Sequence, residues 1–217
     1  MTKLRSLTEF DDAVSDETAW RKQELSMARK SVSASSGVAL QSSLRAGVLL
    51  LYAHWEGWIK NTSRLYLRFV NTKKLRYDEL SVAFLGNALK TRLSGMEVAH
   101  SATTHNEFAL FLREGMGDRA RVSEDLVRTE SNLSSRVLAD IVHRLGLPLE
   151  VEFSTRFNMI DTELVDRRNT IAHGQYLDIT TGDFLQLHSD VIAMLERFTD
   201  ELLNAAATGA YRSVRTE

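Results

Sequence analysis

Hydrophobic side chains recur at helical spacing along most of the chain. Between Val38 and Asn71 they return every three or four residues, which places them on one face of a single long helix. The positions of this stripe are Leu44, Val48, Leu51, Trp55, Trp58, Ile59 and Thr62. A helix of this length extends about 50 Å, and we expect it to be the longest element and the centre of the fold.

The same spacing predicts five further helices, at Asp16–Ser33, Glu79–Val98, Ser134–Leu145, Asp161–Ala172 and from Thr181 or Gly182 to Ala206. Ser15 or Asp16 is the expected cap of the first, Asp78 of the second and Asp161 of the fourth. Gly146 and Pro148 close the third, as a C-terminal glycine and a proline commonly do.

The connecting segments carry weaker patterns. A short helix is expected at Asn106–Glu114, turns at Ser31–Gly37 and a loop from Gly115 to Asn132. The only candidate strand is Gln175–Thr180, and it is short. The sequence therefore predicts an all-α helical bundle with a long central helix, an extra N-terminal helix and an inserted region of loop and short helix.

We expect a single domain over residues 1–217, because the length fits one domain and the composition does not change along the chain. Within it, we expect the core at about 38–206, an N-terminal helical extension at 1–37 and a flexible tail at 207–217. We find no role in the sequence for residues 1–37 or 99–132.

Composition narrows the function classes. The chain has no cysteine, which excludes disulfides, thiolate metal sites and cysteine nucleophiles and fits a cytoplasmic location. Its one proline suits long helices. No apolar run is long enough to span a bilayer. With a net charge of -2, nucleic acid can be attracted only by a local basic patch.

The segment most suggestive of chemistry is Asp161–Tyr176, DTELVDRRNTIAHGQY. It contains Arg168, Asn169 and His173. Asn169 and His173 are four residues apart and share a helix face, whereas Arg168 is displaced by about 140° from His173. A long guanidinium can still bend toward the imidazole near the end of the helix. Alone, this spacing is also typical of an ordinary polar helix face.

The string RRNTIAHG resembles the catalytic signature of the HEPN superfamily, in which Arg precedes His by five to seven residues and Asn often follows the Arg. Two further stretches, LLYAHWEGWIK and SNLSSRVLADIVHRLGL, are similar to a bacterial subfamily of defence or toxin proteins. The resemblance extends over roughly Val38 to Ala206.

This resemblance implies a metal-independent endoribonuclease in which a 2′-hydroxyl attacks the neighbouring phosphate. His173 is the implied general base or acid, Arg168 the phosphate ligand, and Asn169 the group that orients the phosphate or the histidine. It also implies a homodimer with a composite active site, an RNA substrate, and an antitoxin or defence partner. No cofactor and no metal are expected.

Four side chains on the predicted central helix follow one another at steps of four, namely Glu56, Lys60, Arg64 and Arg68. We expect Glu56 beside the catalytic pair, with Lys60, Arg64 and Arg167 binding substrate. The alternative is a solvated face whose ion pairs contribute only about 0.3–0.5 kcal/mol each. His100 and His105 have no third ligand at a spacing that completes a metal site.

Three functions remain open from the sequence. The first is a ribonuclease acting as a toxin or defence effector. The second is a non-catalytic all-α module that binds RNA or protein as a scaffold, and the third is a nucleotide-binding sensor. Metal-free RNA cleavage that depends on His173 separates the first from the other two.

Overall fold

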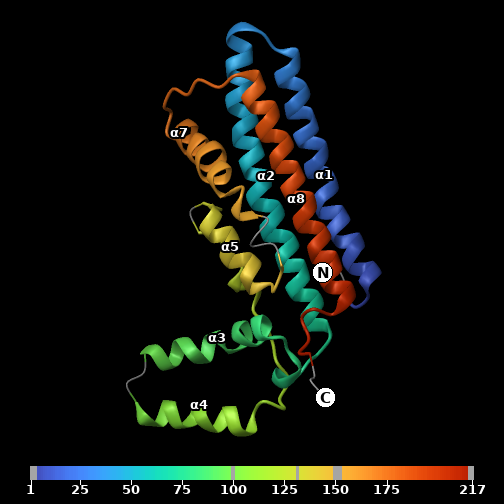
Figure 1. The fold of residues 1–217 in the computed structure, drawn as a ribbon, viewed down its shortest axis with the longest axis vertical. Helices are drawn as coiled ribbons and strands as arrows, with labels where there is room; N and C mark the ends of the chain where they lie inside the picture. Colours follow the sequence, from blue (N-terminus) through green and yellow to red (C-terminus); the bar gives the residue numbers. More distant parts are fainter. Residues whose placement is uncertain (1–3, 99–100, 131, 149–152, 215–217) are drawn as a thin grey trace.

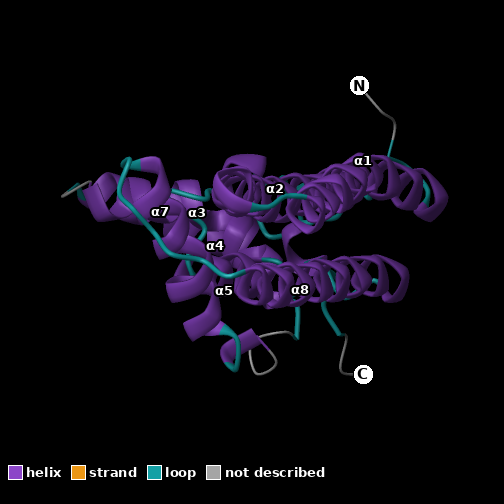
Figure 2. Cartoon of the chain, turned by 90° about the horizontal axis from the view of Figure 1, so that it is seen from above, coloured by secondary structure: helices purple, strands orange, loops and turns teal. Residues whose placement is uncertain are grey.

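A computed structural model describes residues 4–98, 101–130, 132–148 and 153–214. The chain forms an all-helical fold, as predicted (Figures 1 and 2). Its helices are α1 (Leu7–Ala34), α2 (Gly37–Thr72), α3 (Val82–Val98), α4 (Ala102–Glu114), α5 (Ser135–Arg144), α7 (Arg167–Ala172) and α8 (Thr181–Thr208). Single 3₁₀ turns occur at Tyr77–Glu79 and Glu124–Leu126, and Met159–Asp166 is a π-helix. Within the described residues no strand forms, so Gln175–Thr180 is a loop and not a strand.

Helices α1, α2 and α8 lie side by side as the main bundle, with α2 the longest described helix at 36 residues. Trp55 and Trp58 of α2 are fully buried. The Trp58 indole donates to Thr199 Oγ1 of α8 at 2.9 Å, and the Trp55 indole donates to the Leu133 carbonyl at 3.1 Å. The predicted apolar stripe is therefore the centre of the core, and its two indoles also fix the neighbours of α2.

The first helix begins earlier than predicted. Ser6, not Ser15 or Asp16, is its N-cap: Ser6 accepts from the Glu9 N–H, and the Glu9 carboxylate accepts from the Ser6 N–H. This reciprocal capping box satisfies two backbone donors at the helix start. Phe10 is fully buried against Phe69, with ring centres 5.0 Å apart. The turns of α1 that precede the predicted start therefore pack against the core.

The prediction that Asp78 caps the next helix is also wrong. Asp78 lies in the Tyr77–Glu79 turn, where its carboxylate pairs with Arg76, and α3 begins only at Val82. Helices α3 and α4 project from the end of the bundle opposite α7 (Figure 1). They form an arm in which Arg92 lies over the Phe111 ring at 4.0 Å.

The described part of the predicted flexible tail, residues 207–214, continues α8 and contacts the rest of the bundle. Helix α8 continues to Thr208, and Gly209 closes it in the left-handed conformation at φ 70°. Tyr211 is buried, and its carbonyl accepts from the Ser81 N–H at 2.9 Å. The chain is thus anchored through Ser213, which donates to the Glu79 carbonyl, while residues 215–217 lie outside the described part.

Candidate active site on α7

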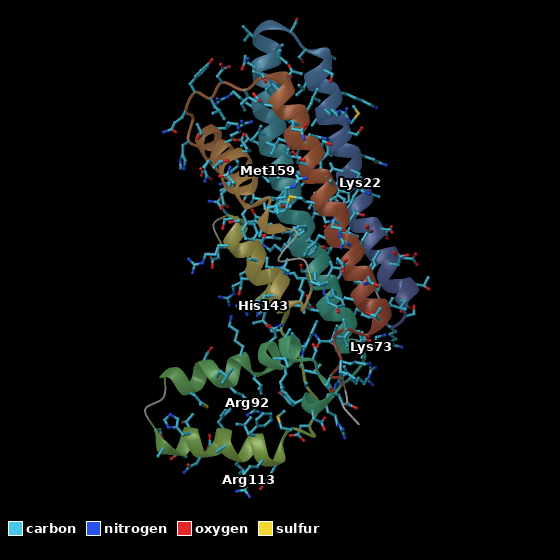
Figure 3. The ribbon with its side chains drawn as sticks, viewed as in Figure 1. Lys22, Lys73, Arg92, Arg113, His143 and Met159 are labelled. Atoms are coloured by element: carbon cyan, nitrogen blue, oxygen red, sulfur yellow. The ribbon has the colours of Figure 1, made fainter. Side chains whose placement is uncertain are left out.

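The π-helix that leads into α7 sets which side chains face the core. Met159, labelled in Figure 3, begins it, and the buried residues that follow are Ile160, Leu164 and Val165. Spacings of four and five suit the wider turn of a π-helix, which is frequent at functional sites. This segment anchors α7 and leaves Arg168, Asn169 and His173 away from the aliphatic core.

Asp161 does not cap this helix, because the residues before it are already helical. Its carboxylate instead accepts from the Ser135 N–H at 2.8 Å and from the Ser135 hydroxyl at 2.6 Å. Ser135 is the first residue of α5, whose N-terminal N–H groups need acceptors. Asp161 therefore joins the π-helix to the start of α5.

Arg168 is held by three neighbours. Its Nη1 donates to Asn169 Oδ1 at 2.7 Å and to Asn132 Oδ1 at 2.9 Å. Its guanidinium carbon lies 4.6 Å from the centre of the Tyr52 ring on α2. A guanidinium has five N–H donors, so Nε and Nη2 keep three donors that bond to none of the described residues. The group is therefore oriented, and part of it remains able to bind an anion.

Tyr52 provides the ring under Arg168 and is itself fixed through its hydroxyl. The Leu133 N–H donates to this hydroxyl at 2.8 Å. The pKa of Tyr52 is raised to about 12, chiefly by burial and also by the negative charge of Glu56, against the opposing effect of the Leu133 N–H. The phenol consequently stays neutral, and its ring is a fixed surface for a cation.

Asn132 belongs to a segment for which the sequence indicated no role. This segment runs antiparallel to α2, as shown by hydrogen bonds from Asn71 to Val122 and from Thr129 to Glu56. It ends where Leu133 meets Tyr52 and Trp55. The predicted loop therefore supplies one of the two amide oxygens that orient Arg168.

His173 lies at the C-terminal end of α7. Its N–H donates to the Asn169 carbonyl at 3.0 Å, and Gly174 follows in the left-handed conformation at φ 72°. The imidazole is exposed and bonds to no other described side chain. A nucleotide can therefore approach His173 from solvent, at one end of the same helix that holds Arg168.

Comparison with known proteins assigns the family. The family model described as HEPN_MAE_28990-like HEPN matches residues 10–211. The chain belongs to this HEPN family. No curated protein matches the chain, and no solved structure does. The match begins within α1 and continues through the arm, so it includes residues 10–37 of the predicted N-terminal extension and the whole 99–132 region.

Asn169 Oδ1 accepts a hydrogen bond from Arg168, and the side chain makes no hydrogen bond with His173 among the described residues. The expected role of Asn169 in orienting the phosphate or the histidine remains a prediction. Tyr52 and Asn132 were missed by the sequence interpretation. Tyr52 lies in LLYAHWEGWIK and Asn132 in SNLSSRVLADIVHRLGL, the two further stretches that carried the HEPN resemblance, but neither residue was given a role.

The other predicted site residues of this HEPN domain are spread along α2 and α7. Glu56 accepts from Thr129 Oγ1 at 2.5 Å and lies one turn from Tyr52, whose ring lies under Arg168. Arg167, the first residue of α7, pairs with Glu163 of the preceding π-helix. The placement of Glu56 beside His173, and a substrate role for Arg167, remain predictions.

Lys60 and Arg64 are half-buried on α2. Arg64 lines a pocket of about 330 Å³ that also contains Asp16 and Glu17 of α1. Their role as substrate ligands remains a prediction too. Across the described residues, no three His, Asp or Glu side chains gather as a metal site requires. The described helices are all too short or too polar to span a bilayer.

Proposed function

We propose that this HEPN domain is a metal-independent endoribonuclease that uses Arg168 and His173. The observation that carries the proposal is the state of Arg168, which is oriented by Tyr52, Asn132 and Asn169 yet keeps three donors that bond to none of the described residues. A guanidinium held in this way suits a phosphate, whose oxygens accept two parallel N–H bonds. The exposed imidazole of His173 lies on the same short helix.

The proposed reaction is an internal transfer at phosphorus. The 2′-hydroxyl loses its proton and attacks the adjacent phosphate, the bond to the 5′-oxygen breaks, and that oxygen receives a proton. The products are a 2′,3′-cyclic phosphate and a free 5′-hydroxyl. His173 moves a proton, because imidazole titrates near neutral pH, and Arg168 stabilises the negative charge on the phosphate oxygens.

The first experiment measures cleavage of a 5′-labelled single-stranded RNA by pure protein in excess EDTA. We expect cleavage with cyclic phosphate ends, reduced roughly 10²–10⁴-fold in His173→Ala because a general acid or base is lost. His143→Ala, which removes an exposed histidine of α5, is the matched control and should cleave normally. Wild-type protein that binds RNA without cleaving it would favour the alternative, a non-catalytic RNA- or protein-binding scaffold.

We also propose that the active unit is a homodimer with two copies of His173 in one cleft. The reaction needs one proton removed and one delivered, and one imidazole is poorly placed to do both in a single in-line step. A two-fold contact pairs the two sites automatically. When His173→Ala subunits are mixed in excess with wild type, activity should fall faster than the wild-type fraction. A strictly proportional loss would exclude the shared site.

A role as a toxin or defence effector, held in check by an antitoxin or partner protein, extends this proposal and rests on the family resemblance. Induced expression of the wild-type chain in a bacterial host should then arrest growth. The His173→Ala chain, expressed to the same level, should not. Equal growth of both strains would contradict the toxin role but would not bear on the proposed nuclease reaction.

A further inference from the structure

A basic pocket lies at the C-terminal end of α2, away from α7. We call it the α2 end pocket; it has a volume of about 1020 Å³ and is lined by Leu4, Arg5, Arg68, Asn71, Thr72, Lys74, Arg119, Ala120, Arg121 and Glu124. Lys73, labelled in Figure 3, marks this end of the bundle, near both chain termini. Three separate segments of the chain therefore converge there.

The lining of the α2 end pocket has an excess of positive charge. Five of its lining residues are cations, and Glu124 is the only carboxylate among them. Glu124 is already used, since it pairs with Arg68 at 2.7 Å. The side chains of Arg5, Lys74, Arg119 and Arg121 make no hydrogen bond or ion pair with the described residues. Four cations of the pocket thus have no carboxylate partner among the described residues, in a chain whose net charge is -2.

The surroundings strengthen this positive potential. Lys73 lies beside the pocket, donates to the Arg5 carbonyl at 2.9 Å and sits 3.9 Å from the Phe69 ring centre. Burial lowers the pKa of Lys73, and the positive charge of Arg212 lowers it further. Like charges held this close repel one another, so an anion that enters the pocket relieves repulsion as well as forming new bonds.

We propose that the α2 end pocket binds the phosphate backbone of single-stranded RNA. Free guanidiniums form forked hydrogen bonds to phosphate oxygens, and cations from several segments suit repeated phosphates rather than one. The lining has no aromatic side chain on which a base could stack, and its only apolar members are Leu4 and Ala120. The pocket therefore recognises the backbone and not the base.

The position of the pocket relates it to the proposed cleavage site. Arg68 and Tyr52 lie on the same helix, sixteen residues apart, which is about 24 Å at 1.5 Å per residue. The 122–133 segment runs along α2 between these two points. The choice of RNA rests on the proposed nuclease function: a strand cut at Arg168 and His173 would lie in the α2 end pocket farther along its length.

The experiment measures binding separately from cleavage. Protein carrying His173→Ala is titrated into a fluorescent oligouridine of roughly twenty nucleotides, at salt concentrations between about 50 and 200 mM. The test variant adds Arg119→Gln and Arg121→Gln, which replace two exposed side chains that form no ion pair with the described residues. The matched control adds Arg29→Gln and Lys30→Gln, two exposed cations near the opposite end of α1. Circular dichroism verifies that all variants fold equally.

We expect the test variant to bind more weakly and its slope of log affinity against log salt to become shallower by about 1.4, since each lost phosphate contact removes about 0.7. Arg29→Gln with Lys30→Gln should leave the slope unchanged. Equal slopes in the test variant and its His173→Ala parent would overturn the inference. So would normal RNA binding by a test variant that no longer binds a polyglutamate peptide, because an acidic protein would then be the ligand.

Failure of the nuclease proposal has a different signature. Wild-type protein could fail to cleave RNA while the Arg119 and Arg121 substitutions still reduce the salt dependence of RNA binding. That result would support the RNA site and contradict the proposed reaction. If cleavage occurs, Arg119→Gln with Arg121→Gln should raise KM for the long RNA and leave kcat/KM for a dinucleotide unchanged. Equal losses on both substrates would overturn the inference.

Discussion

The guanidinium carbon of Arg168 lies 4.6 Å from the centre of the Tyr52 ring, although the two residues are far apart in the sequence. This contact joins α7 to α2 where the 122–133 segment ends. A cation stacked on a ring loses little freedom when it later binds an anion. Tyr52 is therefore a positioning residue for Arg168.

The ring and the hydroxyl of Tyr52 make different contacts: the ring lies under Arg168, and the hydroxyl accepts from the Leu133 N–H and donates to Asn132 Oδ1 at 3.5 Å. Tyr52→Leu removes the ring and should lower kcat/KM for RNA about tenfold, since a cation–π contact of this kind contributes about 1–2 kcal/mol. Tyr52→Phe keeps the ring but leaves the buried Leu133 N–H without its acceptor, and should cost about 1–3 kcal/mol of unfolding free energy. If Tyr52→Phe loses as much activity as Tyr52→Leu, the hydroxyl and not the ring positions Arg168.

Asp161 should stabilise the fold through α5 and not through its own helix. Asp161→Ala removes two short hydrogen bonds to Ser135, which should lower the free energy of unfolding by about 1.5–3 kcal/mol. Asp166→Ala is the matched control, because Asp166 is exposed in the same π-helix and its carboxylate bonds to no described residue. Urea unfolding measures both variants, and equal losses would contradict the assigned bonds.

The long helix was predictable because its signal is continuous. The apolar stripe placed α2 at Val38–Asn71, and the structure has Gly37–Thr72. The start of α1 was missed although its signal is present. Ser6 and Glu9 are spaced as a capping box, but only one large apolar residue, Phe10, follows before a run of two aspartates.

The candidate site was predictable only in its local part. Arg168, Asn169 and His173 are visible because they lie within six residues of one another. Tyr52 and Asn132 join them through the register of a long loop against α2, which no local pattern specifies. Asp161 shows the same limit, because an aspartate before an apolar run indicates a cap but does not tell which helix it serves.

Two glycines offer a paired test of the α2–α8 contact. A Cβ on Gly47 would lie 2.7 Å from the ring of the fully buried Phe184, whereas a Cβ on Gly86 in α3 would meet nothing within 4 Å. Gly86→Ala should stabilise by about 1 kcal/mol through helix propensity. Gly47→Ala should destabilise by about 1–3 kcal/mol despite the same propensity, because the core is overpacked. Thermal unfolding measures the stability of both variants. If both are more stable than wild type, the close approach of Gly47 to Phe184 is contradicted.

Buried histidines should make the fold less stable at mildly acidic pH. Burial lowers the pKa of His188 below its ordinary value of 6.5, and the positive charge of Arg29 lowers it further, against the opposing bond to the Leu25 carbonyl. Burial also lowers the pKa of His54. The unfolded chain then binds these protons more readily than the folded chain, so the free energy of unfolding is highest above about pH 6.5 and falls as pH drops through that value.

The measurement compares urea unfolding at about pH 7.5 and pH 5.5. Wild type should be less stable at the lower pH, and His188→Gln should show a smaller difference between the two because it removes one of the groups responsible. His143→Gln, which replaces an exposed histidine on α5, is the matched control and should keep the wild-type difference. A His188→Gln protein with the full wild-type difference would show that His188 does not contribute, whatever its effect on stability at either pH alone.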